Sequence, residues 1–340
     1  MEQGTITLYD KQRPAFGRTN DAWEEKPMKK IPVVMDVDTG TDDAIAIICA
    51  LMSRNQLDIK AITAVAGNVP LSATASNTLN IVDLLGHTDI PVAKGADRPL
   101  KRELQCSVSH GATGFGDVVI PASARPFCEK DAAQMLHDIA VDCAGELIYI
   151  GTAPQTNLAT ALQRYPDLVG LIKKVYLMGG CLVGGNTTQA SEFNAYADPE
   201  AMQIVFRSGL DVTMVGLDVT LKTAVPMWVK EAVERVETPE AQLASQVIDF
   251  CLRRNKEWGY DEANLHDVVA FCALVNPSVL TFKKYYMDVE TEGTITRGMT
   301  VADFRDVCPD KEKNVWCAED IDLGRFWRWF VDLFQTYEKK

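Results

Sequence analysis

The sequence predicts an α/β fold in which helices flank a mainly parallel central sheet. Two observations support this prediction. From Ile31 onward, short apolar runs alternate with longer amphipathic stretches, which is typical of parallel strands joined by helices. Several apolar runs end in polar or glycine-containing segments, and parallel sheets bind ligands at the carboxyl ends of their strands. Because no internal repeat or linker divides residues 31–340, we expect a single domain there.

Each predicted element follows from its local pattern. Apolar runs rich in Val, Ile and Leu predict six strands, at residues 31–38, 57–67, 90–95, 146–153, 174–180 and 210–220. Helical patterns lie between them, at residues 42–54, 72–86 and 198–209. Beyond about Pro226 the chain is predicted to turn helical, as in residues 245–275, and residues 285–304 are predicted to form a hairpin.

The first 30 residues differ from the rest of the chain. Residues 1–30 are polar and lack periodicity, so we expect an N-terminal extension that is ordered, if at all, through Phe16 and Trp23. Its start lacks the basic and apolar regions of a signal peptide. The longest apolar run, residues 44–52, is too short to span a bilayer. The sequence therefore favours a cytoplasmic protein without a membrane partner.

Composition narrows the class of ligand. The chain has 34 basic and 47 acidic residues, a net charge of −13 and a pI near 4.9. This balance argues against nucleic acid and against anionic membranes, since both select for basic surfaces. The 9 cysteines are scattered singly without a C-x-x-C pair, which indicates reduced thiols rather than a disulfide framework. A small neutral or cationic ligand fits these properties.

The segment DVDTGTDD, residues 36–43, places four carboxylates within eight positions directly after an apolar run. At roughly 5 Å and an effective dielectric constant near 20, each ionised pair repels by about 3 kcal/mol. A capped first helical turn would explain Asp42 and Asp43 but not all four. The crowding is explained if a cation lies among the carboxylates, or if one of them holds a proton. We therefore expect a metal or catalytic role for this segment.

Two enzymatic interpretations of the acidic segment remain open at this point. It is close to D-x-D-x-T, the signature of haloacid dehalogenase-like phosphatases, with Asp36 as the nucleophile. However, Gly40 occupies the fifth position, and the threonine comes one residue late. The alternative is D-x-D-x-x-x-D-D, a site for a hard cation that binds a sugar diol.

Histidines supply the next candidates. His266 and Asp267 follow a polar and aromatic segment and precede an apolar helix, where Asp267 could reach a metal while His266 faces a ligand. Their rival, the His137–Asp138 pair, lies within an ordinary amphipathic helix pattern and is interpreted as structural. His110 lies in the glycine-rich segment SHGATGFGD and is a mobile-loop candidate, whereas His87 is interpreted as a helix-end residue.

From Ile31 to the C-terminus the chain resembles the calcium-dependent nucleoside hydrolases of the inosine-uridine-preferring (non-specific) type. The segments that carry the resemblance occur in the family's order and with family-like spacing. They are DVDTGTDDA, AVAGN, SHGATGFG, GTAPQTNLA, LMGG, SEFNAYADPEA, GLDVT, LHD and RGMTVADFR. The resemblance implies a nucleoside-hydrolase-like fold with a Rossmann-like core. It also implies hydrolysis of purine and pyrimidine ribonucleosides, of the inosine and uridine type, to ribose and free base.

The resemblance implies one Ca²⁺ site. Its ligands would be Asp38, Asp43, the backbone carbonyl of Thr152 and Asp267, completed by water and by the ribose hydroxyls. Such an all-oxygen set suits calcium. Asp36 would support these ligands from behind. A homodimer or homotetramer is also expected.

The remaining site residues follow from the same resemblance. Residues implied to bind the ribose hydroxyls are Asp42, Asn68, Asn186, Glu192 and Asn194. Met178 and Phe193 would pack against the sugar, and Trp258 and Tyr260 would flank the base, with His110 as a further substrate-binding candidate.

The implied mechanism passes through an oxocarbenium-like transition state, whose positive charge clustered carboxylates tolerate. Asp38 would take a proton from a calcium-bound water, and His266 would protonate the departing base. A phosphatase would need a lysine at a later strand end, which LMGG and GLDVT do not supply. A non-catalytic calcium- or ribose-binding protein would not need His266 as an acid beside Asp38 and Asp267.

Overall fold

The computed structural model describes residues 29–305 and 311–337. The expected N-terminal extension, residues 1–30, therefore lies outside the described residues except for its last two. None of the described helices is both long enough and apolar enough to cross a membrane.

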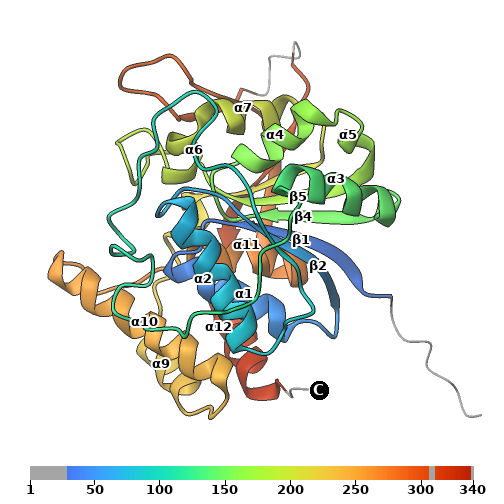
Figure 1. Ribbon diagram of the computed structural model, residues 1–340. Coiled ribbons are helices and arrows are strands. Elements are labelled where there is room, and N and C mark those ends of the chain that lie inside the picture. The colour runs from blue at the N-terminus through green and yellow to red at the C-terminus, as the bar shows by residue number, and fades with distance from the viewer. Residues whose placement is uncertain (1–28, 306–310, 338–340) are drawn as a thin grey trace, which may run out of the picture.

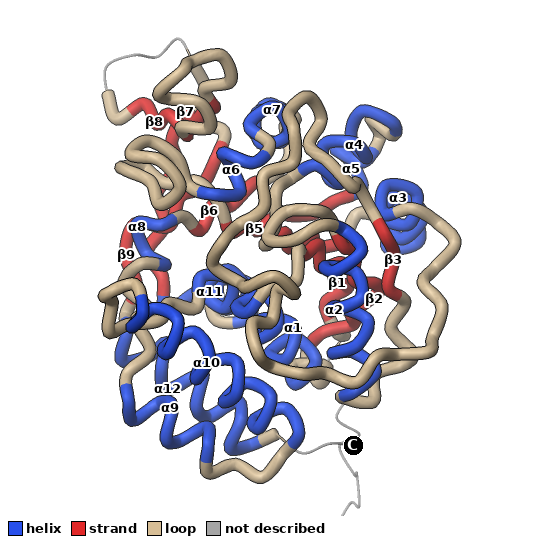
Figure 2. Tube along the Cα trace, turned by 60° about the vertical axis from the view of Figure 1, so that its left-hand side comes forward, coloured by secondary structure: helices blue, strands red, loops and turns tan. Residues whose placement is uncertain are grey.

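A single nine-stranded sheet runs through the described residues. Its strands are β1 (Ile31–Val37), β2 (Leu57–Ala64), β3 (Val92–Lys94), β4 (Leu147–Gly151), β5 (Ile172–Met178), β6 (Val212–Val215), β7 (Leu280–Val289), β8 (Thr300–Asp303) and β9 (Val315–Ile321). The strand order is β3-β2-β1-β4-β5-β6-β9-β7-β8, and β3 and β8 lie on opposite sides of the molecule in Figure 2. From β3 to β9 the pairing is parallel, and β7 and β8 are added antiparallel at one edge.

Helices cover both faces of the sheet (Figure 1). On one face lie α3 (Ala132–Cys143), α4 (Thr156–Arg164), α5 (Leu168–Leu171) and α7 (Pro199–Arg207). On the other face lie α1 (Thr41–Met52), α2 (Leu71–Leu84), α9 (Met227–Glu234), α10 (Pro239–Glu257), α11 (His266–Val275) and α12 (Leu323–Thr336). The short helices α6 (Phe193–Ala197) and α8 (Leu217–Thr220) follow β5 and β6.

Two apolar cores, one on each face, hold these layers together. The larger contains Ile45, Ile48 and Phe271 of the α1 and α11 layer, and the smaller contains Leu158 and Phe206 of the α4 and α7 layer. Every residue of α1 is buried, because this helix packs between the sheet and further helices. Burial of each such large apolar side chain contributes about 1.5–3 kcal/mol, so the acidic segment before α1 is held by a rigid frame.

The sheet has its topological switch point at β1. This strand pairs with β2 on one side and with β4 on the other. The connection after β1 leads to β2 on one side, and the connection after β4 leads to β5 on the opposite side. At such a point the loops after the two neighbouring strands separate and leave a crevice at their carboxyl ends. Those loops carry the acidic segment after β1 and Thr152 after β4.

The α/β class and the mainly parallel sheet are confirmed, and the hairpin at residues 285–304 is confirmed as β7 and β8. The strand predicted at 210–220 is partly wrong. It ends at Val215, and residues 217–220 form α8. A Cβ atom on Gly216 would lie 2.7 Å from the carbonyl oxygen of Gly180, so the backbone turns there against the loop after β5.

Candidate active site

The acidic segment links β1 to α1 and brings its carboxylates together in a buried place. Asp38 follows the strand, and Asp42 and Asp43 lie in the first turn of α1. Oδ2 of Asp43 accepts a hydrogen bond of 3.0 Å from the Gly40 backbone N–H, which caps the helix. A Cβ atom on Gly40 would approach His110 to 2.5 Å, so a glycine is needed where the His110 loop crosses the segment.

Two aspartates of this segment form a cluster with Asp267 of α11. Ligand oxygens of Asp42, Asp43 and Asp267 all lie within 4.8 Å of one another. Asp38 stands beside them, and its Oδ2 accepts a hydrogen bond of 2.6 Å from the Asn68 backbone N–H. Its Oδ1 is buried and has no hydrogen-bond partner among the described residues. A buried carboxylate oxygen without a partner is costly, and a bound cation would stabilise it.

The electrostatics of the cluster support the same conclusion. Burial, and then repulsion from Asp42, raises the pKa of Asp43 to about 7. Burial and repulsion among the carboxylates also raise the pKa of Asp38 and of Asp267 well above the ordinary value. A bound cation would reverse these shifts, because it favours the ionised form. The site therefore fits a metal ion.

The donor chemistry also fits a hard cation. Every candidate ligand is an oxygen, which is the preference of calcium and magnesium. The Thr152 carbonyl oxygen faces this region and accepts a hydrogen bond of 3.0 Å from Asn194 Nδ2. The hydroxyl of Thr152 donates to Asp43 Oδ1 at 2.7 Å, so the loop after β4 both offers a ligand and orients another.

Asp36 has a different environment from the other three aspartates. It is fully buried, and its carboxylate accepts hydrogen bonds from Thr63, from Tyr149 at 2.8 Å and from Asn157 at 2.7 Å. Burial, partly offset by these donors, raises its pKa to about 6. A carboxylate enclosed by three donors is unsuited to attack a substrate. Asp36 therefore supports the loop, and the phosphatase interpretation loses its nucleophile.

Removal of one donor to Asp36 tests this supporting role. Tyr149→Phe leaves Oδ2 of Asp36 buried without its hydroxyl donor, so we expect the free energy of unfolding to fall by about 1–3 kcal/mol. Urea unfolding measures the difference. Tyr260→Phe, at an exposed tyrosine, should leave stability unchanged. Equal stability of the two variants would show that Asp36 does not depend on Tyr149.

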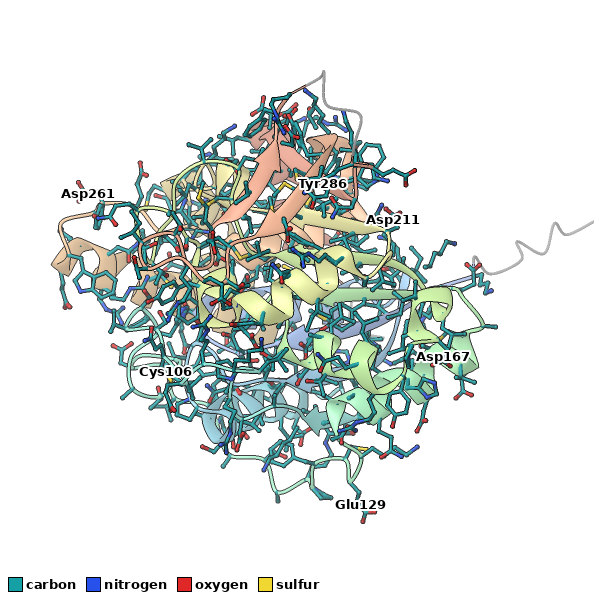
Figure 3. The ribbon with its side chains drawn as sticks, turned by 90° about the horizontal axis from the view of Figure 1, so that it is seen from above. Cys106, Glu129, Asp167, Asp211, Asp261 and Tyr286 are labelled. Carbon is teal, nitrogen blue, oxygen red and sulfur yellow. The ribbon has the colours of Figure 1, made fainter. Side chains whose placement is uncertain are left out.

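A cavity of about 210 Å³ opens beside the carboxylate cluster. Most of the sequence-predicted substrate residues line it, namely Asp42, Asn68, His110, Met178, Asn186, Glu192, Phe193, Asn194, His266 and Asp267, together with Thr152. Asp38 and Asp43 are fully buried and do not line it, although their neighbour Asp42 does. Figure 3 shows Cys106 and Asp261, which belong to loops near the cavity, on the same side of the molecule.

Trp258 and Tyr260 are not among the residues that line this cavity. Trp258 ends α10 and is 47% exposed, and Tyr260 is 66% exposed. Their expected role beside the base therefore has no cavity contact to support it, and it stays a prediction.

The amides around the cavity are held in place by the backbone. Asn194 Nδ2 donates to the carbonyl oxygens of Thr152 and Met178, at 3.0 and 3.1 Å. Glu192 caps α6, since its two carboxylate oxygens accept hydrogen bonds from the backbone N–H groups of Gly180, Asn194 and Ala195. Glu192 thus has a structural function that the sequence did not indicate. These contacts hold the polar groups at the cavity wall.

His266 begins α11 beside the cavity. Its Nδ1 lies 2.8 Å from the Thr220 hydroxyl at the end of α8. When this hydroxyl donates to Nδ1, the ring proton is on Nε2. Burial, and then the charge of Arg254, lower the pKa of His266 to about 4, so the imidazole is neutral near pH 7.

His110 lies against the acidic segment. Its Nδ1 is 3.1 Å from the backbone nitrogen of Thr41 and 4.0 Å from Asp42 Oδ1. Burial is the main cause that lowers the pKa of His110 to about 3. His110 therefore packs on the carboxylate segment as a neutral ring.

The other two histidines lie elsewhere. His137 lies in α3, stacks on Tyr165 and contacts Asp167 at 3.0 Å. Asp167 is on the opposite side of the molecule from Asp261 (Figure 3). His87 follows α2 and contacts Arg54 at 2.9 Å. The structural interpretation of both histidines agrees with these positions.

Several cavity residues were not anticipated from the sequence. They are Thr41, Ser107, Ser109, Thr187, Cys251, Arg254, Asn255 and Asn264. Cys251, Arg254 and Asn255 follow the i, i+3, i+4 spacing of one helix face. This spacing is the sequence signal that could have shown that the three residues of α10 face the same way. Thr220 was missed because its segment was taken for a strand.

A parallel sheet with buried carboxylates clustered at its switch point defines a metal-dependent enzyme of the α/β class. A family model described as inosine-uridine preferring nucleoside hydrolase matches residues 33–328. The chain therefore belongs to the inosine-uridine preferring nucleoside hydrolase family.

Individual relatives agree with this membership. Over 310 residues the chain is 38% identical to the pyrimidine-specific ribonucleoside hydrolase RihA of Escherichia coli O139:H28, covering 90% of this chain and 99% of the relative. The purine-preferring ribonucleoside hydrolase from Gardnerella vaginalis matches with a TM-score of 0.83 at 33% identity, covering 89% of this chain and 98% of that chain. A plant nucleoside hydrolase, PpNRh1, matches with a TM-score of 0.85 at 29% identity, covering 91% and 100%.

The resemblance seen in the sequence is thereby confirmed, together with the fold. The protein is a hydrolase that cleaves ribonucleosides into ribose and free base. Both alternatives, a phosphatase and a non-catalytic binding protein, are set aside.

Proposed function

We propose that the metal is Ca²⁺ and that Asp38, Asp43, Asp267 and the Thr152 carbonyl hold it. One observation carries this proposal. The partnerless Oδ1 of Asp38 is buried beside the three clustered carboxylates. When bound, the ion supplies a Lewis acid that makes a water more acidic and attracts the ribose hydroxyls.

The chain's own residues then provide the proton transfers. Asp38 accepts the proton of the attacking water, because its carboxylate is buried beside the other carboxylates of the site. The surrounding carboxylates stabilise the positive charge that develops on the sugar. Both functions depend on the same feature, which is acidic groups packed at the switch point.

His266 is the proposed proton donor to the departing base. The Thr220 hydroxyl, 2.8 Å from Nδ1, favours the tautomer with the proton on Nε2. The resting imidazole is neutral, so it must first take up a second proton. Nδ1–H would then donate to the Thr220 hydroxyl, and the imidazolium would give its Nε2 proton to the departing base. His266 and Asp267 are neighbours in the sequence, which links the acid to the metal site.

The ribose is proposed to bind between the carboxylates and the amides of the cavity. Asp42, Asn68, Asn186, Glu192 and Asn194 would hold the hydroxyls. Met178 and Phe193 would pack against the ring. The location of all seven at the cavity wall supports this assignment.

The ribose contacts make 2′-deoxynucleosides poor substrates. A site that binds a hydroxyl leaves buried polar groups unpaired when the hydroxyl is missing. We expect kcat/KM for 2′-deoxyinosine to be about 100-fold lower than for inosine, from the loss of a hydrogen bond to a charged group. Steady-state assays of both substrates measure this ratio. Comparable values would remove the proposed ribose clamp, while hydrolysis of neither substrate would refute the proposed activity on inosine.

The substrate range is proposed to include purine and pyrimidine ribonucleosides, because the relatives include one named pyrimidine-specific and one named purine-preferring. Residues 31–340 are proposed to form a single catalytic domain, which the continuous sheet supports. A homodimer or homotetramer and a cytoplasmic location stay predictions, as do base contacts from Trp258 and Tyr260 and a substrate contact from His110.

A further inference from the structure

The cavity contains a cation that the mechanism above does not use. Among the described residues that line it, Arg254 is the one arginine or lysine. Arg254 lies in the last turns of α10, with Cys251 and Asn255 on the same cavity-facing side. The other titratable side chains of the lining include the carboxylates Asp42, Glu192 and Asp267 and the two neutral histidines.

The guanidinium is held in a defined position. Its Nε and Nη2 donate to Asn255 Oδ1, at 3.0 and 2.7 Å. The group lies 5.7 Å from the ring centre of Phe250 and 5.2 Å from that of Trp258, within the range of cation–π attraction. Trp258 therefore packs against Arg254.

One edge of the guanidinium has no partner. Nη1 is buried and makes no hydrogen bond to any described residue. Buried N–H donors are nearly always paired, and a charged donor without an acceptor is costly. The charge of Arg254 also contributes, after burial, to the lowered pKa of His110 and His266. Burial raises the pKa of Asp42, and the charge of Arg254 opposes this rise. The charge of Arg254 thus lies within electrostatic reach of both cavity histidines and of Asp42.

We propose that Arg254 recognises the nucleobase and selects bases with an exocyclic carbonyl oxygen, such as uracil and hypoxanthine, over their amino counterparts. The Nη1 edge donates to that oxygen. An amino group at the same position would present a donor to a donor. The inference rests on the proposed function, since it places the base beside Arg254 and His266, which line the same cavity.

Arg254 complements His266 rather than replacing it. A guanidinium does not give up its proton in proteins, so Arg254 cannot protonate the base. Its fixed positive charge stabilises the negative charge that spreads to the carbonyl oxygen as the N-glycosidic bond breaks. The interaction therefore strengthens towards the transition state and is expected to affect kcat as well as KM.

The test compares matched substrate pairs in the calcium-loaded enzyme. We expect the wild type to prefer inosine to adenosine and uridine to cytidine by at least about tenfold in kcat/KM. Arg254→Met removes the donor, and kcat/KM for inosine and uridine should fall by about 10- to 100-fold, as for a charged hydrogen bond. Values for adenosine and cytidine should change by less than about threefold. Arg254→Lys, which keeps the charge, should give an intermediate preference.

Lys256→Met is the matched control, because Lys256 is an exposed cation on the same helix. It should keep the wild-type preference. The calcium-induced rise in melting temperature of each variant shows that fold and metal site are intact. The inference would be overturned if Arg254→Met and Arg254→Lys lowered kcat/KM equally for inosine and adenosine, and equally for uridine and cytidine. It would also be overturned if neither variant lowered kcat/KM for inosine or uridine. A wild type that hydrolyses no ribonucleoside would instead overturn the proposed function, and the inference with it.

Discussion

Chelation of the metal is expected to abolish ribose release from inosine and uridine, and added Ca²⁺ is expected to restore it. The reason is that Asp38, Asp43 and Asp267 are buried together and repel one another without a cation. Zn²⁺ should substitute poorly, because every proposed ligand is an oxygen. Reducing-sugar assays of the stripped and reconstituted enzyme measure the effect.

A second readout separates binding of the metal from catalysis. Calcium that binds the folded state alone raises the melting temperature with increasing concentration. Asp43→Asn should weaken this dependence, since it removes one negative ligand from the cluster. Lys256→Met provides the control for a surface charge change. Full activity of a thoroughly chelated, metal-free sample would contradict the metal proposal.

The fold was largely predictable because buried parallel strands are continuous apolar runs. That signal found β1 to β6, and amphipathic patterns found α1, α2, α3 and α7 but not α4, α5 or α6. It did not find β9, whose exposed and buried residues are mixed. This strand inserts between β6 and β7, although it follows both in sequence. Pairing between distant segments decides its place, and no local pattern encodes that.

The site was predictable where its chemistry is concentrated in the sequence. Four carboxylates in one segment indicated the metal cluster, and the His266–Asp267 pair before an apolar helix indicated Asp267. Arg254 gave no comparable signal. It stands next to Arg253, which forms a surface ion pair with Asp117, and the two look alike in the sequence. Only the packing of α10 against α1 shows which arginine faces the cavity.

Replacement of His266 by alanine should separate the leaving-group acid from the water base. The change removes a proton donor but keeps Asp38 and the metal ligands. Hydrolysis of inosine or uridine should fall by about 10²- to 10⁴-fold in kcat, the usual contribution of one general acid. A p-nitrophenyl riboside, whose leaving group departs without protonation, should be hydrolysed almost normally.

Asp38→Asn supplies the contrasting variant. Both substrates need an activated water, so this change should slow inosine and the p-nitrophenyl riboside alike. The measurement is kcat for each substrate with the wild type and both variants. If His266→Ala slows the activated riboside as much as inosine, His266 does not protonate the base. The proton would then come from Tyr260 or from an ordered water.

Thr220→Val removes the hydroxyl partner of His266 Nδ1. If His266 is the acid, this variant should lower kcat for inosine by less than His266→Ala does and should leave kcat for the p-nitrophenyl riboside almost unchanged.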